Sequence, residues 1–189
     1  AVDSVLARVG LDKCSIEGNR LIKGHQDMEF DFSAVAKGYG VDCVAAMLRR
    51  NGVHDYMVEI GGEVAVAGKN ARGTGWRIQI DAPTSGADGH EAFTVLELSD
   101  RAIASSGNYR NFREGGDTRI GHTIDPKIGR PAETRSLATT VVAPNCGLAD
   151  ALATALMICD PDSASTIIAQ FPSTGAIIMT ADSIYRINM

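Results

Sequence analysis

A carboxylate and a hydroxyl one helical turn apart are the first candidates for chemistry in this sequence. In the stretch GLADALATAL, Asp150 and Thr154 are four residues apart, so on a helix their oxygens would share one face. A magnesium ion takes one or two protein carboxylates and completes its shell with water and phosphate, so it could use this pair. In the structural alternative, Asp150 complements the helix N-terminus and Thr154 bonds back to a carbonyl one turn earlier.

A second candidate is the start of a helix in FDFSAVAKGYG. Asp31 and Lys37 flank this start, and Gly38 and Gly40 lie in the first turns. Glycine lowers helix stability, so its presence indicates that another group approaches the backbone closely. A helix N-terminus with a lysine would suit a phosphate group. Tight packing of the helix on a neighbouring strand explains the glycines as well.

The third candidate is His122, two residues before the Ile-Asp-Pro turn of GHTIDPKIGRP. The unperturbed pKa of histidine is about 6.5, which suits proton transfer beside a ligand. The alternative is a histidine at a strand end with no chemical role, because histidine is commonly intermediate in burial.

The elements that must position these residues follow from hydrophobic periodicity and from turn signals. Apolar residues at helical spacing, alternating apolar residues and the pair Asp160-Pro161 predict helices and strands along the whole chain. We expect strands at 28–32, 55–60, 63–68, 76–81, 93–99, 101–106, 122–124, 137–143, 174–180 and 183–188, and helices at 33–50, 147–159 and 160–171. Strands and helices do not alternate one to one, so the predicted class is α+β with mixed or largely antiparallel sheets and packed helices.

Composition excludes several classes of protein. The net charge of -5, with acidic and basic residues interspersed, gives no basic surface for a nucleic acid. The four cysteines form no C-x-x-C pair, which argues against a thiolate zinc site or a thioredoxin-like motif. No apolar run could span a bilayer, and the first residues lack the order of a secretory signal. A helical turn begins at residue 1 without a cap, so we expect that upstream sequence has been removed.

Other familiar motifs fail on spacing. Five residues separate Gly62 from Gly68, and Asn70 stands where a phosphate loop has its Ser or Thr, so GGEVAVAGKN predicts a hairpin. DAPTSGADG lacks the alternating oxygen ligands of a calcium loop, and the sequence has no G-x-S-x-G.

Six stretches, in this order, resemble the FAD:protein FMN transferase family, also called ApbE-type flavin transferases. They are DFSAVAKGYGVD (31–42), VEIGGEVAVAG (58–68), WRIQIDAP (76–83), IASSGNYRNF (103–112), HTIDPKIGRPA (122–132) and VVAPNCGLADALATAL (141–156). The resemblance covers most of the chain. It implies a single ApbE-like domain over residues 1–189, with a two-lobed α+β fold that lacks part of the N-terminal region of the family.

The resemblance also implies an enzyme and its substrates. FAD lies between the lobes, its pyrophosphate is cut with Mg²⁺, FMN is joined to a threonine of an acceptor protein, and AMP leaves. Carried over by position, the implied metal ligands are Asp150, Thr154 and the Ala34 carbonyl, the implied FAD contacts are Asp31, Lys37 and Ile124, and the implied catalytic residue is His122. Some relatives have a second acid where this chain has Ala153, which argues for one metal ion.

Two further functions fit the same motifs. One is an FAD pyrophosphatase that releases FMN and AMP without a protein acceptor, and the other is a catalytically silent flavin-binding module. From the resemblance we also expect the bacterial periplasm, or the outer face of the cytoplasmic membrane, as the location.

Overall fold

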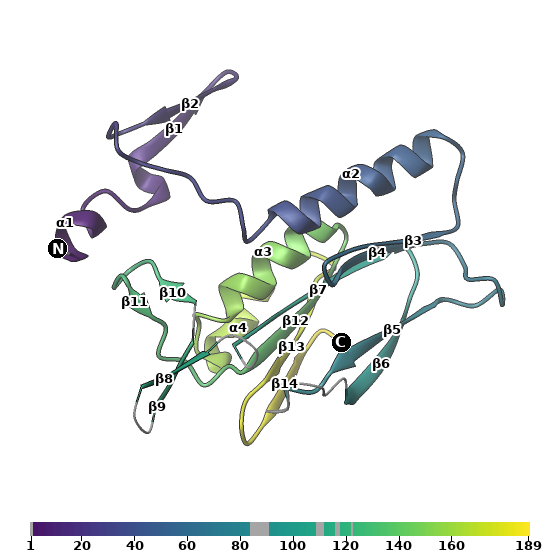
Figure 1. Ribbon diagram of the computed structural model, residues 1–189. Coiled ribbons are helices and arrows are strands. Elements are labelled where there is room, and N and C mark those ends of the chain that lie inside the picture. The colour runs from purple at the N-terminus through teal and green to yellow at the C-terminus, as the bar shows by residue number, and fades with distance from the viewer. Residues whose placement is uncertain (1, 84–90, 109–111, 116–117, 122) are drawn as a thin grey trace.

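The structure, a computed structural model, describes residues 2–83, 91–108, 112–115, 118–121 and 123–189. A six-stranded sheet forms its centre (Figure 1). The strands lie in the order β14 (Ile184–Ile187), β13 (Gly175–Met179), β12 (Ala138–Ala143), β7 (Arg101–Gly107), β4 (Glu63–Ala67) and β3 (Tyr56–Ile60). Every neighbouring pair is antiparallel. The predicted α+β class with a largely antiparallel sheet is confirmed.

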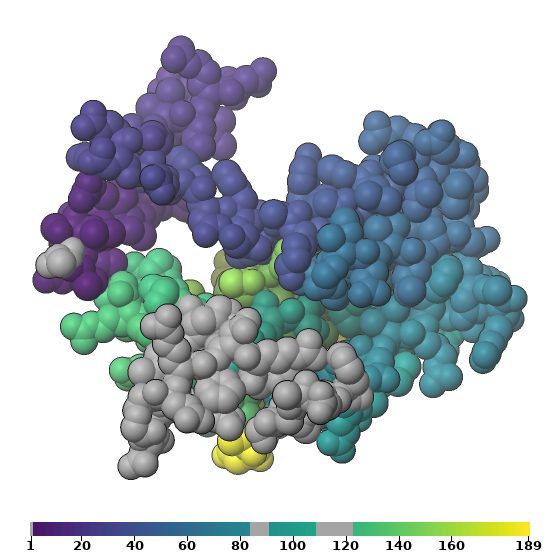
Figure 2. Space-filling view, in the orientation of Figure 1, coloured from purple at the N-terminus to yellow at the C-terminus, as the bar shows by residue number. Residues whose placement is uncertain are grey.

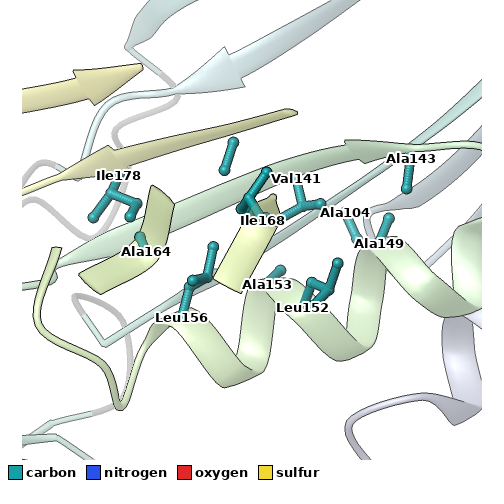
Figure 3. Packing of buried hydrophobic residues seen from close by; sticks show 11 residues of the cluster. Ala104, Val141, Ala143, Ala149, Leu152, Ala153, Leu156, Ala164, Ile168 and Ile178 are labelled. Atoms are coloured by element: carbon teal, nitrogen blue, oxygen red, sulfur yellow. The ribbon is translucent and has the colours of Figure 1, made fainter. Parts of the chain in front are cut away.

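Helices cover one face of this sheet, and a two-stranded hairpin covers the other. The helices are α2 (Ala36–Arg50), α3 (Cys146–Leu156) and α4 (Pro161–Ile168), and the hairpin pairs β5 (Trp76–Asp81) with β6 (Ala92–Leu98). Side chains of α3, α4 and the central strands pack into one apolar cluster (Figure 3). Because side chains alternate along a strand, Ala102 and Ala104 of β7 face the helices while Ile103 packs toward the hairpin.

The remaining elements are short. The N-terminal segment comprises α1 (Val2–Leu6), a 3₁₀ turn (Leu11–Lys13), and the hairpin of β1 (Cys14–Glu17) with β2 (Arg20–Lys23). Figure 1 shows this segment standing away from the sheet, and in Figure 2 its purple atoms form a projection at the upper left. Two more hairpins pair β8 (Phe112–Gly115) with β9 (Thr118–Gly121), and β10 (Ile124–Asp125) with β11 (Arg130–Pro131). Among the described residues, no helix has the length and apolar character needed to cross a bilayer.

Several predicted elements differ from the structure. The helix predicted at 33–50 begins only at Ala36, and the helix predicted at 147–159 ends at Leu156. Residues 28–32 form no strand, and none of the segments that the structure describes pairs with them; the rings of Phe30 and Phe32 stack, with their centroids 6.3 Å apart. The helix predicted at 160–171 has the expected Asp160 cap and Pro161 but already ends at Ile168. The predicted strand 122–124 overlaps β10 only at Ile124, and His122 lies outside the described residues.

Candidate active site

Helices α2 and α3 cap each other's first turns. Asp150, buried on α3, accepts a hydrogen bond at Oδ2 from the backbone N–H of Gly38, 3.0 Å away in the first turn of α2. In return, the Asp42 carboxylate of α2 accepts from the N–H groups of Cys146 and Gly147, each at 2.8 Å. Asp150 therefore does complement a helix N-terminus, but that of α2. The alternative that placed it at the start of its own helix is wrong.

Gly38 lets these two helices approach so closely. A Cβ atom at this position would lie 2.4 Å from the carbonyl oxygen of Cys146 and 2.8 Å from Cβ of Asp150. At Gly40 the nearest atom to such a Cβ is Cδ1 of Ile60, at an ordinary 3.4 Å. The predicted close approach thus exists at Gly38, where the neighbour is a helix and not the strand that the packing alternative expected.

The Thr154 hydroxyl contacts a neighbouring strand. Its Oγ1 lies 3.2 Å from Oγ of Ser106, near the end of β7. Among the described contacts, this one takes the place of the bond to a carbonyl of its own helix that the structural alternative expected. Asp150 and Thr154 are both on α3, four residues apart as the sequence requires.

Lys37 forms an ion pair with an acid that sequence reasoning did not identify. Its Nζ lies 2.7 Å from Oε1 of Glu63, the first residue of β4. The Glu63 side chain is only 2% exposed and that of Lys37 is 47% exposed. Burial raises the pKa of Glu63, with a further rise from nearby Asp150, and the Lys37 ammonium opposes this increase.

Glu63 left one signal in the sequence. It is the only charged residue of EVAVA, a strand that is otherwise apolar, and it follows directly on the Gly61-Gly62 turn. A buried acid at such a position needs a partner, which periodicity alone cannot supply.

Asp31 has a local role in the turn before α2. Its exposed carboxylate accepts hydrogen bonds from the N–H of Ser33, at 2.7 Å, and from the Ser33 hydroxyl. The hydroxyl and then the amide lower the pKa of Asp31 by stabilising the carboxylate. Asp31 is therefore ionised and held close to the start of α2.

Ile124 belongs to a different part of the structure. It is half exposed on β10, opposite Pro131 of β11. Gly129, in the connection between these two strands, packs against Val2 and Leu6 of α1. The described contacts join Lys37, Gly38, Asp150 and Thr154 through α2 and α3, but they do not bring Ile124 to this group.

A cavity of about 720 Å³ adjoins the Lys37–Glu63 pair, between the central sheet and the β5–β6 hairpin. Lys37 of α2 lines it together with polar residues of several strands, among them Arg77, Ser105, Ser106 and Thr140. Oγ of Ser105 lies 2.8 Å from Oγ1 of Thr140, and Ser106 connects the cavity to Thr154. The volume is in the range of cavities that hold small-molecule ligands.

The oxygen donors of this region suit a hard cation. Ala34 lies in the turn before α2, four residues before Gly38, whose N–H binds Asp150. The Ala34 carbonyl, the Asp150 carboxylate and the Thr154 hydroxyl each offer an oxygen, the donor type that magnesium prefers. Within the described ranges, no three His, Cys, Asp or Glu residues gather into a metal site.

The comparisons with known proteins identify the family that shares this three-layered α+β fold. The chain belongs to the ApbE family, whose model matches residues 1–178. The recognition made from the six sequence motifs is confirmed.

Relatives of known name support this assignment. The chain is 44% identical over 152 residues to an FAD:protein FMN transferase of Vibrio cholerae serotype O1, which covers 80% of this chain and 45% of that protein. It is 33% identical over 171 residues to the FAD:protein FMN transferase of Escherichia coli strain K12, covering 88% and 48%. The chain thus spans about half the length of these relatives.

Solved structures show the same fold. The flavin transferase ApbE of Vibrio cholerae superposes with a TM-score of 0.85 at 35% identity, covering 99% of this chain and 60% of that one. The apo form of the Pseudomonas stutzeri flavinyl transferase ApbE gives 0.85 at 32% identity, covering 99% and 58%.

Proposed function

We propose that this chain carries the catalytic site of an FAD:protein FMN transferase. The enzyme moves FMN from FAD to a threonine hydroxyl of an acceptor protein and releases AMP. The observation that carries the proposal is the junction of α2 and α3, where Asp150 caps the first turn of α2 next to Lys37. Thr154 follows one turn later on α3, and Lys37 lines the adjoining cavity of about 720 Å³. The names of the relatives point to the same reaction.

The proposed reaction is a phosphoryl-type transfer. The threonine oxygen of the acceptor forms a bond to the phosphorus of the FMN half of FAD, and the bond from that phosphorus to the bridging oxygen breaks. The bridging oxygen leaves with AMP. The proton of the threonine hydroxyl must go to a base, and we assign this role to His122, on the motif that precedes Ile124.

Asp150, Thr154 and the Ala34 carbonyl would hold a magnesium ion at this site. When bound, such an ion neutralises charge on the pyrophosphate and orients it for in-line attack. The burial of Asp150 supports this role, because a carboxylate away from bulk water attracts a cation more strongly.

The FAD contacts in this proposal are Asp31, Lys37 and Ile124. Lys37 combines a half-exposed ammonium with a place in the first turn of α2, where the helix dipole favours an anion. Asp31 lies on the turn that precedes the helix. Ile124 offers an exposed apolar side chain on β10.

For the location we propose the bacterial periplasm or the outer face of the cytoplasmic membrane, from family resemblance.

One incubation separates this function from its alternatives. The 189-residue chain is mixed with FAD, magnesium and a protein that presents an accessible threonine, and the products are followed by mass spectrometry and flavin fluorescence. We expect an acceptor that has gained the mass of FMN, together with AMP. Free FMN and AMP without a modified acceptor would indicate a pyrophosphatase, and intact bound FAD would indicate a binding module.

A further inference from the structure

Glu63 is a buried carboxylate next to the candidate site, and the proposed reaction does not use it. Of its two oxygens, Oε1 is paired with Lys37 Nζ at 2.7 Å, while Oε2 is buried and has no hydrogen-bond partner among the described residues. A buried carboxylate with one empty oxygen is costly, since burial removes its hydration. This cost suggests a functional role for the Glu63 carboxylate.

The Lys37 side chain is held at two points, by the Gly61 backbone and by Glu63. The Gly61 backbone lies against the Lys37 stem, because a Cβ on Gly61 would be 3.3 Å from Cδ of Lys37. Glu63 is anchored in β4, the strand between β3 and β7 in the central sheet. The flexible end of Lys37 is therefore tied to a rigid strand at its tip and supported by the turn along its stem.

The Lys37 ammonium has N–H donors left for a ligand while it is paired with Glu63. A lysine ammonium has three N–H donors, and the described ion pair with Glu63 uses one. The Lys37 side chain is 47% exposed and lines the cavity beside the site. Its remaining donors are thus open to an anion that enters the cavity.

We infer that Glu63 is a positioning residue that fixes the Lys37 ammonium at the start of α2 for contact with the pyrophosphate of FAD. The inference rests on the proposed function for the identity of the anion. Fixing a flexible lysine before binding removes the entropy loss that the ligand would otherwise have to offset. The alternative is that Glu63 only neutralises the charge of Lys37. In that case the removal of Glu63 would strengthen the binding of an anion.

A double-mutant cycle on FAD affinity distinguishes these two effects. Dissociation constants are measured by flavin fluorescence, with magnesium present, for the unaltered chain, Glu63→Gln, Lys37→Met and the double variant. Glutamine keeps the shape and one acceptor but loses the charge. We expect Glu63→Gln to weaken FAD binding roughly tenfold, the size of one charge-assisted hydrogen bond. In the Lys37→Met background the same change should have less than about a twofold effect, because Glu63 acts through the lysine.

Two further variants complete the design. Glu17→Gln removes an exposed acid of the β1–β2 hairpin that is not among the cavity-lining residues, and it should leave the FAD dissociation constant within about twofold of the unaltered value. Glu63→Asp keeps the buried charge and withdraws it by one methylene, so it should give an intermediate loss. It also serves as the test if Glu63→Gln does not fold in a thermal melt.

The outcomes are distinct. Unchanged or tighter FAD binding by Glu63→Gln, or an equal loss in both lysine backgrounds, overturns the positioning role and leaves the proposed function standing. If the unaltered chain binds no FAD, the proposed function and this inference both fail.

Discussion

The Asp150 carboxylate has two roles, one as the cap of α2 and one as a proposed magnesium ligand. One oxygen caps the first turn of α2 through Gly38, and the proposed magnesium ion needs the charge of the same group. A substitution that removes the whole side chain would therefore disturb the helix start and the metal together. Asparagine separates the two roles, because it keeps an oxygen for the N–H of Gly38 and loses the negative charge.

We predict that Asp150→Asn abolishes magnesium-dependent turnover while the free energy of unfolding changes by less than about 1 kcal/mol. Asp150→Ala should lose turnover as well and also destabilise the protein by about 0.5–2 kcal/mol through the lost cap. AMP release with and without magnesium measures turnover, isothermal titration measures magnesium binding, and urea denaturation measures the free energy of unfolding. Asp162→Asn, on an exposed acid paired with Arg135, is the control. Magnesium binding that survives in Asp150→Asn would contradict the assigned site.

Cys146 provides a test of the same helix junction through pH. Burial, with the charges of Asp42, Glu63 and Asp150, raises the pKa of this thiol from 9.0 to about 12. The folded protein therefore keeps a proton that the unfolded chain releases above pH 9. The stability that this contributes is complete below pH 9 and is lost as the pH rises toward 12, at up to about 1.4 kcal/mol per pH unit.

We predict that Cys146→Ala loses less stability than the unaltered chain between pH 8.5 and about 11. The alanine variant lacks the titrating thiol, and all other groups titrate in both proteins. Urea denaturation at several pH values gives the difference between the two curves. Parallel curves over this range would show that the thiol is not buried as described.

At the scale of elements, the contact between α2 and α3 decides the site. Each helix supplies an acid to the other, and the backbones meet at a glycine. Helix starts are positive and carry free N–H groups, so a carboxylate from a neighbouring helix both caps and orients them. This reciprocal pair explains why Asp150 is buried without a basic side chain beside it in the described contacts.

We predict that Gly38→Ala destabilises the protein by about 1–3 kcal/mol and weakens magnesium binding. Its Cβ would meet the Cys146 carbonyl, a backbone atom that cannot move without shifting α3. Gly40→Ala is the matched control in the same helix: its Cβ has room, and alanine should stabilise the helix by up to about 1 kcal/mol. Equal effects of the two substitutions in urea denaturation would exclude the close contact.

At the scale of the whole molecule, stability is concentrated around the central sheet. Leu156 of α3 is fully buried in the cluster between helices and sheet (Figure 3), whereas Ile16 in the N-terminal β1–β2 hairpin is 78% exposed. The hairpin stands away from the sheet, so its apolar side chains add little to the core (Figure 1).

We predict that Leu156→Ala lowers the free energy of unfolding by about 2–5 kcal/mol, through lost burial and the cavity it leaves. Ile16→Thr should change it by less than about 0.5 kcal/mol. Both values come from chemical denaturation of the complete chain. A large loss from Ile16→Thr would mean that the N-terminal hairpin is packed in solution.

The sequence by itself determined the elements whose signals are local, and it identified the family. Alternation of Trp76, Ile78 and Ile80 marked β5, and Asp160-Pro161 marked the start of α4. Six motifs in one order were enough for the family. The strand and helix signals depend on neighbours within a few residues, and the motif order is a property of the sequence itself. Both can therefore be read without the tertiary structure.

Only the tertiary structure decided which groups meet. Asp150 binds Gly38, 112 positions away, and Lys37 pairs with Glu63, 26 positions away. Residues 28–32 have the alternation of a strand but no partner among the described segments, and a strand requires a neighbour to pair with. Contacts of this kind depend on how helices and sheet pack, since the periodicity of one segment carries no information about the segment that will lie against it.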